Sequence, residues 1–241
     1  MDSSRSAAAD STRARIIAAA TRLLAEGGRD AVSTRAVSAA AGVQAPTIYR
    51  LFGDKQGLLD AVASHGFASY LASKAHREPG PDPVEDLRRG FEENVQFGLA
   101  NPGVYALMAS DPRPGAVSPA YAAGIEVLAK IVSRIAEAGR LRVTEQLATQ
   151  LITSGGRGTT LTLISLPEDQ RDPALIHAAR EAVVAAVTTD RPVAASPGPA
   201  AAAVTLRAVL PHATALSASE RGLLTEWLDR IAAGGTPDPA R

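Results

Sequence analysis

The sequence predicts an all-α protein in which a three-helix N-terminal domain is joined to a larger helical bundle. Apolar residues recur at helical spacing through most of the chain, and Gly- and Pro-rich clusters separate these segments. No segment has a convincing strand pattern, and no internal repeat is present. We expect three regions: 1–76 as the N-terminal domain with 1–10 disordered, 77–234 as the larger domain, and 235–241 as a tail.

The composition excludes several classes of protein. Apolar residues make up 46% of the 241 residues but aromatic residues only 4%, so a core must consist mainly of Ala, Leu, Val and Ile. The absence of cysteine excludes disulfides, thiolate chemistry and zinc–thiolate sites. No apolar run approaches the roughly 18–20 residues that a membrane span needs, and the polar first ten residues are unlike a secretory signal. These features predict a cytoplasmic protein with no membrane partner.

Charge is distributed unevenly along the chain. The net charge is zero, but residues 1–75 contain nine Lys or Arg and six Asp or Glu, a net of +3, which leaves −3 for the remainder. A basic excess confined to one end is what a module that faces phosphates requires.

That basic end contains the pattern of two short helices joined by a tight turn. Ser33 is suited to cap the first helix, with Val32 and Val37 spaced as a hydrophobic staple. Gly42 is the residue type that ends a helix in a left-handed conformation. Pro46 is then expected in the first turn of a second helix, where its missing N–H costs little. This is a helix-turn-helix, whose second helix enters a major groove of DNA.

The apolar periodicity predicts the other helices. An amphipathic helix runs from about Thr12 to Gly27-Gly28, and its Arg13, Arg15 and Arg22 are expected on a solvated face. Helices behind the helix-turn-helix are expected near 55–74, 84–100, 104–108, 119–139, 143–166, 172–189, 204–210 and 217–234.

Two later segments depart from a simple helical pattern. Gly155-Gly156-Arg157-Gly158 interrupts the helix at 143–166, and indicates close approach of another helix or a ligand, or a break; we favour a continuous, kinked helix. Residues 190–201 are rich in Pro and Ala and predict a loop. After it, Ser217 and Glu220 form a capping-box pattern at the start of the last helix.

The order of residues in the helix-turn-helix resembles one known family. Ser33-Thr34-Arg35, Ala41-Gly42-Val43, Pro46-Thr47-Ile48-Tyr49, Phe52, Lys55 and Leu58-Leu59 are together similar to the DNA-binding domain of the tetracycline-repressor (TetR) family. The resemblance covers roughly residues 12–75. It implies a regulator that binds a palindromic operator as a homodimer through helices near 143–166 and 172–189, and that releases DNA when a small molecule binds the larger domain.

The resemblance also implies which residues contact DNA. Arg35 is similar to an arginine that the family can place on a guanine edge, although a surface ion pair with Asp30 is the alternative. Four residues at the start of the second helix approach base edges: Gln44, Ala45, Pro46 and Thr47. Phosphate contacts are expected from Ser33, Thr34, Tyr49, Arg50 and Lys55, whereas Leu51 and Phe52 are expected in the core. The ring of Tyr49 has a core position as its alternative.

Effector-binding residues are expected among the helices at 84–100, 118–138 and 143–166. The candidates are Phe91, Asn94, Tyr105, Met108, Tyr121, Gln150, Ser154 and Arg157. Most have an equally good structural explanation: Phe91, Tyr105 and Met108 suit a core, and Asn94 an exposed surface. Arg157 suits an acidic ligand or a contact with the other subunit.

Other functions fit the sequence less well. The four histidines are scattered, and no catalytic, metal-binding or nucleotide-binding spacing is present, so we expect no enzyme, no cofactor and no metal site. The alternatives that stay open are an activator of the same family, and a helical small-molecule-binding protein without a DNA function.

Overall fold

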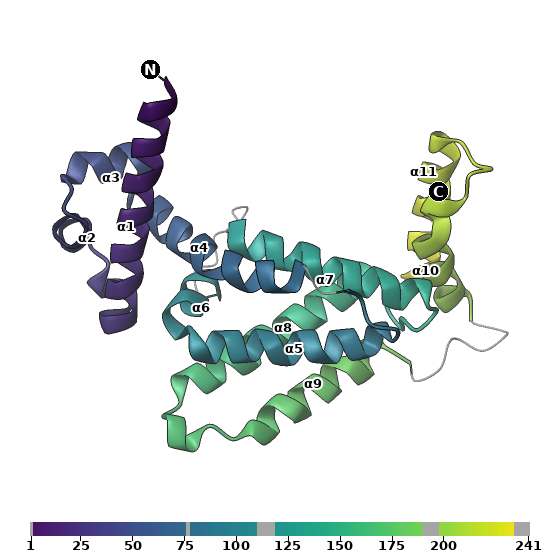
Figure 1. Ribbon diagram of the computed structural model, residues 1–241. Coiled ribbons are helices and arrows are strands. Elements are labelled where there is room, and N and C mark those ends of the chain that lie inside the picture. Colours follow the sequence, from purple (N-terminus) through teal and green to yellow (C-terminus); the bar gives the residue numbers. More distant parts are fainter. Residues whose placement is uncertain (1, 76–77, 110–118, 190–197, 234–241) are drawn as a thin grey trace, which may run out of the picture. The chain divides into compact units, whose positions relative to one another are not determined.

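The computed structural model is helical, and the structure describes residues 2–75, 78–109, 119–189 and 198–233 (Figure 1). The helices are α1 (Asp2–Ala31), α2 (Thr34–Ala41), α3 (Ala45–Phe52), α4 (Lys55–Ala75), α5 (Pro83–Ala100), α6 (Pro102–Ala109), α7 (Pro119–Glu137), α8 (Glu145–Ser165), α9 (Pro173–Val187), α10 (Pro199–Val209) and α11 (Ala218–Ala232). Short 3-10 helices, η1 (Glu168–Gln170) and η2 (Leu210–His212), follow α8 and α10. The described residues contain no strand, only an isolated bridge between Leu141 and Thr188. The predicted all-α class is confirmed.

Packing divides the chain into two units. Unit 1 comprises residues 1–77, 96–124 and 163–165, and unit 2 comprises 78–95, 125–162 and 166–241. The sequence places a domain boundary near residue 76, but in space α6 packs against α1 and α4, and the end of α5 belongs to the same unit. Sequence order alone does not show this arrangement, because it arises from contacts between distant segments.

The core of unit 1 is formed by apolar side chains from its first helices and α6. Its fully buried members include Ile16 of α1, Val37 of α2, Ile48 of α3 and Leu58 of α4. α1 begins at Asp2, so residues 2–10 are helical rather than disordered as predicted; the alanines at 7–9 favour helix and extend it. The predicted end of this helix is found, because the backbone leaves helical geometry at Gly27-Gly28 before a last turn.

The core of unit 2 joins α5, α7, α8, α9 and α10. Leu87, Val132, Ile135, Leu141 and Val187 are among its most buried members. α8 runs without a break through its glycines, which confirms the continuous helix. A Cβ added at Gly155 would overlap Val183 of α9, so this glycine permits close approach of a helix.

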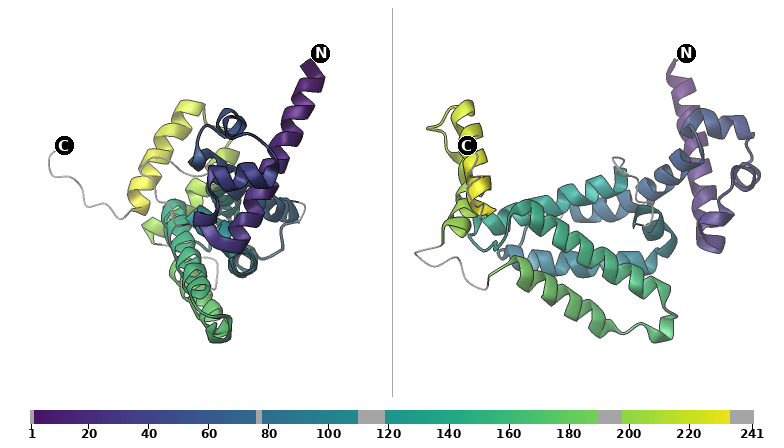
Figure 2. Two further views of the ribbon diagram at one scale, coloured as in Figure 1. Left: turned by 90° about the vertical axis from the view of Figure 1, so that its left-hand side faces the viewer. Right: turned by 180° about the vertical axis from the view of Figure 1, so that it is seen from behind.

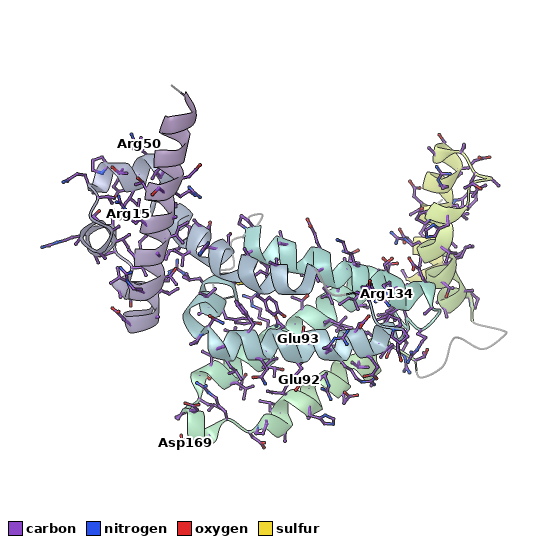
Figure 3. The ribbon with its side chains drawn as sticks, viewed as in Figure 1. Arg15, Arg50, Glu92, Glu93, Arg134 and Asp169 are labelled. Carbon is purple, nitrogen blue, oxygen red and sulfur yellow. The ribbon has the colours of Figure 1, made fainter. Side chains whose placement is uncertain are left out.

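Charged side chains of unit 2 are held in pairs. Asp86 of α5 is buried and accepts hydrogen bonds from Arg134 of α7 (2.5 Å), from Arg89 and from the Gly80 N–H (2.9 Å). On the α9 side, Arg88 pairs with Glu181 (3.1 Å), and Arg180 pairs with Glu92 (2.8 Å); Arg134 and Glu92 are labelled in Figure 3.

The end of the chain forms a helical hairpin, α10–α11. The predicted capping box is present: the Ser217 Oγ accepts from the Glu220 N–H (3.3 Å), and Glu220 Oε2 accepts from the Ser217 N–H (2.8 Å). Part of the predicted loop at 190–201 is instead helix, because Pro199 begins α10 at a first-turn position that favours proline. Residues 190–197 and the predicted helix end at Gly234 lie outside the described residues.

Candidate nucleic-acid interface

α2 begins as its sequence indicates. Ser33 has an extended backbone (φ −96°, ψ 151°), and its Oγ accepts a hydrogen bond from the Ala36 N–H at 3.1 Å. Val32 and Val37, on either side of this cap, are completely buried. Because both ends of the cap are held in the core, the start of α2 is fixed relative to the rest of unit 1.

The turn after α2 depends on one glycine. Gly42 has a left-handed backbone (φ 63°, ψ 41°) and ends the helix, its N–H facing the Ala39 carbonyl. The Val43 N–H then donates to the Ser38 carbonyl at 3.0 Å. Glycine tolerates this conformation, which carries the chain from α2 directly into α3.

α3 presents its first turn to solvent. Gln44 occupies the N-cap position with extended backbone, but its side chain makes no capping hydrogen bond and is exposed. Pro46 lies in the first turn as predicted, and Ile48 fixes the helix in the core. Tyr49 is 51% exposed, so the alternative in which its ring is part of the core is wrong. One face of α3 is therefore held by the core while its polar start and Tyr49 remain accessible.

Three cations at this edge have no partner within the described part of the chain. Arg35, Arg50 and Lys55 are exposed and form no ion pair or side-chain hydrogen bond, so the alternative pair between Arg35 and Asp30 does not form. Figure 3 labels Arg50 on α3. Free cations at the surface are suited to a polyanion, because a contact with phosphate then breaks no internal bond.

Other arginines of unit 1 behave differently. Arg13 of α1 donates to the Leu51 carbonyl at 2.9 Å, and its guanidinium lies 4.6 Å from the centre of the Phe52 ring. Arg29 donates to Gln56 at 3.0 Å. The sequence placed Arg13 on a solvated face, because contacts between α1 and the end of α3 are not visible in the periodicity of either helix. Leu51 and Phe52 pack against the core as predicted.

The start of α4 contains a cap that the sequence analysis missed. The Asp54 Oδ1 accepts from the Gly57 N–H at 2.7 Å, which satisfies one of the free donors at the helix start. The signal was available, since Asp immediately precedes Lys55 where the helix was expected to begin. Asp54 also accounts for a lysine at a helix start, because its carboxylate balances the unfavourable dipole there.

The remaining DNA-contact candidates lie at the same edge. Ser33, Thr34, Ala45 and Thr47 are partly buried, and Pro46 is exposed. Ser33 caps α2 and Thr34 begins it, while Ala45, Pro46 and Thr47 form the first turn of α3. The fold therefore brings the predicted set into one part of unit 1.

The effector candidates are not brought together in this way. Tyr105, Met108 and Tyr121 belong to unit 1, where Tyr105 is buried and Met108 packs against the core. The unit 2 candidates are Phe91, Asn94, Gln150, Ser154 and Arg157. Phe91 and Asn94 face Gly156 of α8, since a Cβ there would lie 3.7 Å and 3.6 Å from their side chains. Gln150 and Ser154 are exposed, and Arg157 is partly buried.

The described residues contain neither a metal-binding cluster nor a membrane-spanning helix. Among residues with a described placement, no three His, Asp or Glu side chains gather in a group that could hold a metal ion. No described helix combines the length and the apolar character needed to cross a bilayer.

The geometry of α2, the glycine turn and α3 defines the class: a helix-turn-helix protein whose second unit is a helical bundle. Residues 16–62 match the family described as "Bacterial regulatory proteins, tetR family". The similarity to this family covers the N-terminal helix-turn-helix, and the fold as a whole is that of solved tetR-family transcriptional regulators.

Several solved structures share this fold. A tetR-family transcription regulator described as putative, from Shewanella sp. PV-4, has a TM-score of 0.60 at 17% identity, with 74% of this chain and 98% of that chain covered. The regulator FadR from Bacillus subtilis, solved with stearoyl-CoA, has a TM-score of 0.57 at 19% identity, covering 70% and 96%. A TetR variant from Acinetobacter baumannii AYE, in complex with minocycline, has a TM-score of 0.55 at 21% identity, covering 71% and 93%. No curated protein matches the chain.

Proposed function

We propose that the protein is a ligand-responsive transcriptional repressor that binds a palindromic operator as a homodimer and is released by a small molecule. The observation that carries the proposal is the exposed edge of α2, α3 and the start of α4. There, Arg35, Arg50 and Lys55 have no partner among the described residues, and they lie beside the exposed side chains of Gln44 and Tyr49. A folded domain gains nothing in stability from this set, whereas a DNA backbone and groove satisfy all of it.

Each side chain has a role that follows from its chemistry. Arg35 has a bidentate fork that suits a guanine edge, and Gln44 suits adenine. Ala45, Pro46 and Thr47 offer mainly apolar contact, best suited to a thymine methyl, so indirect readout of DNA shape contributes more of the specificity. Phosphates are bound by Thr34, Tyr49, Arg50, Lys55 and the Ser33 hydroxyl, whose proton stays free to donate while its oxygen caps α2.

The homodimer is supported by the exposed residues of α8 and α9. Those of α8 are Gln146, Leu147, Gln150, Leu151, Ser154, Gly158, Thr162 and Ser165, and those of α9 are Pro173, Ala174, Leu175, His177, Ala178, Ala182, Ala185 and Ala186. None of them is Asp, Glu, Lys or Arg. An exposed surface without charge, composed of Leu, Ala and small polar residues, is typical of the centre of a protein interface.

Two charged side chains of α9 are directed away from this surface. Arg180 and Glu181 of α9 pair with Glu92 and Arg88 of α5, inside unit 2. We name the exposed residues given above the α8–α9 surface and propose that it forms the dimer interface. One recognition helix reads only a few base pairs, so dimerisation supplies the second half-site of a palindrome.

The effector belongs to the helical bundle. Similar folds have been solved with minocycline and with stearoyl-CoA. In this chain, Phe91, Asn94 and Arg157 of unit 2 combine an aromatic ring, an amide and a guanidinium on α5 and α8. To act as an inducer, the small molecule must prefer one spacing of the two heads, with a coupling of ~1–3 kcal/mol.

DNA binding tests the proposal first. Purified protein is titrated by anisotropy against DNA from beside its own gene, across a salt series. We expect two proteins per palindromic site and an affinity that falls steeply with salt. The Arg35→Glu variant is expected to lose specific binding while its thermal unfolding is unchanged. Arg142→Glu, an exposed arginine of unit 2, is the matched control and is expected to bind as wild type.

The outcome separates the alternatives. No specific binding at low salt, either to this DNA or in a selection from random sequences, would leave a helical small-molecule-binding protein without a DNA function. Specific binding that raises transcription from the adjacent promoter would identify an activator rather than a repressor.

The dimer interface is tested by introducing a charge. Ala182→Glu places a carboxylate on the α8–α9 surface and is expected to weaken dimerisation by roughly 100-fold or more, because the charge has no partner there. Ala129→Glu makes the same change on an exposed position of α7 beside Glu126 and Lys130, and is expected to have no effect. Sedimentation equilibrium measures both, and an unchanged dimer in Ala182→Glu would place the interface elsewhere.

A further inference from the structure

The α10–α11 hairpin exposes an apolar face that the proposed function does not use. Of the nine large apolar side chains that are most exposed within the described residues, five lie on these two helices. They are Leu206 (46% exposed), Val209 (37%), Leu223 (47%), Trp227 (47%) and Ile231 (46%). We name these five side chains the hairpin face. Large apolar side chains gathered on one small element indicate a binding surface.

The hairpin face points away from the core of unit 2. On α10, Val204 and Ala208 pack into that core, and Leu206 lies two residues from each, about 200° around the helix. On α11, Ala232 packs against the same core, and Leu223 lies nine residues away, about 180° around the helix. Trp227 follows Leu223 by one turn. On each helix, therefore, large apolar side chains lie on the side opposite the residues that pack into the core.

These side chains are not needed to hold the hairpin together. Its own core consists of Ala203, Leu210 and Leu228, and Arg207 pairs with Asp229 between the helices. The Ser217–Glu220 capping box fixes the start of α11. Each of these contacts uses residues outside the hairpin face, so its exposure does not result from an incomplete fold.

The sequence of α11 is self-complementary when the helix is reversed. Along its exposed side the order is Leu223, Glu226, Trp227, Arg230, Ile231, that is, apolar, acidic, aromatic, basic, apolar. In an antiparallel pair related by a two-fold axis at residue 228, Glu226 lies opposite Arg230 of the second copy. The two Trp227 rings are then offset by about 3 Å along the axis, and Leu223 is offset by the same amount from Ile231 of the second copy.

The composition of the remaining parts of the printed chain offers no match to the hairpin face. The segments outside the described residues contain three large apolar residues, Met1, Val117 and Val193, and are otherwise rich in Pro, Ala, Gly and polar residues. Three such residues in separate segments do not match five large side chains that include a tryptophan. A second copy of the same hairpin matches them in size, apolar character and charge order.

We propose that the hairpin face binds the hairpin face of a second copy of this chain, with α11 antiparallel to α11. This contact is separate from the α8–α9 surface and does not depend on the proposed function. Its area is small, so association is concentration-dependent rather than permanent. Together, the two surfaces would link dimers into a larger assembly and bring more than two DNA-binding heads into one particle.

The chain offers a direct probe, because Trp227 is its only tryptophan. Emission is recorded on the full chain from low nanomolar to high micromolar concentration. We expect a shift to shorter wavelength and reduced acrylamide quenching as the ring is buried. Sedimentation velocity on the same samples gives the stoichiometry. Emission and sedimentation that stay constant with concentration would overturn the proposal.

Charge exchange tests the antiparallel arrangement. Glu226→Arg and Arg230→Glu alone each place like charges opposite one another, and each is expected to weaken association by roughly tenfold or more. Mixed in equal amounts, the two variants restore both intermolecular pairs, and association is expected to return. Within each chain, residues 226 and 230 still carry like charges in the mixture, so recovery cannot come from an intrahelical pair. A mixture as weak as the single variants would exclude this arrangement.

The α8–α9 surface serves as the control. The concentration-dependent emission change is expected to persist in Ala182→Glu, in which that surface is disrupted. If Ala182→Glu removes the emission change as well, Trp227 is reporting the other interface and the proposal is wrong. Far-UV circular dichroism of each variant confirms that α11 remains folded.

Discussion

Charged side chains have different surroundings at the proposed DNA-binding edge of unit 1 and in helices α5, α7 and α9 of unit 2. At the edge of unit 1, Arg35, Arg50 and Lys55 are exposed and have no partner among the described residues. In unit 2, the buried carboxylate of Asp86 accepts from Arg134 and Arg89, and Arg180 pairs with Glu92. The views in Figure 2 show α5, α8 and α9 of unit 2 lying alongside one another.

This difference shows what each surface is suited to bind. Where charges are satisfied internally, the exposed side chains of α8 and α9 carry no charge, which favours contact with another protein. Where cations are left free, the surface favours a polyanion. The net charge of the chain is zero and shows neither feature, because the charges of different regions cancel in the sum. The comparison predicts that removing a charge costs binding in unit 1 and stability in unit 2.

The largest expected effect is on DNA binding. In the double variant Arg50→Ala/Lys55→Ala, the proposed dimer loses four of its proposed phosphate contacts. The slope of log K against log salt is then expected to become shallower by about 3–4, and affinity at moderate salt to fall by about a hundredfold. All sequences should be affected alike, since phosphate contacts carry no sequence information. Anisotropy on specific and random duplexes measures both quantities.

The stability of that double variant provides the control. Neither side chain has a partner in the described part of the chain, so the midpoint of thermal unfolding is expected to match wild type. A large drop in stability would mean that these cations are structural, and the contrast between the two units would not hold.

The next effect concerns the buried carboxylate of unit 2. Asp86→Asn leaves Arg134 without its carboxylate partner and is expected to lower the free energy of unfolding by about 2–3 kcal/mol at neutral pH. Glu92→Gln removes the exposed partner of Arg180 and is expected to cost less than about 1 kcal/mol. Urea unfolding compares the two. Equal costs would mean that burial does not distinguish these ion pairs.

The pH dependence follows from the environment of Asp86. Burial works to raise its pKa, but the Arg134 hydrogen bond, the Gly80 N–H and the charges of Arg89 and Arg134 outweigh burial, and the pKa of Asp86 is lowered. A group with a lowered folded-state pKa contributes stability above its unfolded pKa, about 3.9, and loses it as the pH falls through the folded value. The difference between wild type and Asp86→Asn is therefore expected to shrink below about pH 4.

Local signals could be predicted from the sequence, whereas distant contacts could not. The Ser33 cap, the Gly42 turn and the Ser217–Glu220 capping box each depend on residues within one turn, and all are present. The DNA-contact candidates also lie close in sequence, so the helix-turn-helix pattern alone places them at one edge.

Several features that the sequence analysis could not show depend on partners far along the chain. Arg13 binds the end of α3, 38 residues away, so helical periodicity could only place it on a solvated face. The effector candidates were chosen by residue type, and the packing distributes them between two units. The exposed faces of α8 and of the hairpin depend equally on which neighbours cover each helix.

The third expected effect is on stability and concerns two glycines of α8 in unit 2. A Cβ at Gly155 would overlap Val183, whereas a Cβ at Gly158 meets nothing within 4 Å. Gly155→Ala is expected to destabilise the protein by about 1–3 kcal/mol through overpacking. In the Ala182→Glu background, in which the α8–α9 surface is disrupted, Gly158→Ala is expected to stabilise the protein by up to about 1 kcal/mol, because alanine favours helix. Urea unfolding at one protein concentration tests both, and equal shifts would mean that α8 moves freely against α9.

The smallest expected effect concerns Arg13, a cation of unit 1 that has a hydrogen-bond partner, unlike Arg35, Arg50 and Lys55. Arg13 has a partner, the Leu51 carbonyl, and lies over the Phe52 ring, whereas Arg15 two residues on is exposed without one (Figure 3). Arg13→Ala is expected to cost about 1 kcal/mol of stability, and Arg15→Ala close to none. Because Arg13 contacts the end of α3 rather than DNA, its removal should weaken binding to every duplex only slightly. The slope of log K against log salt should be unchanged. A slope shallower by about 2 per dimer, as for a lost phosphate contact in each subunit, would instead assign Arg13 to the DNA-binding set.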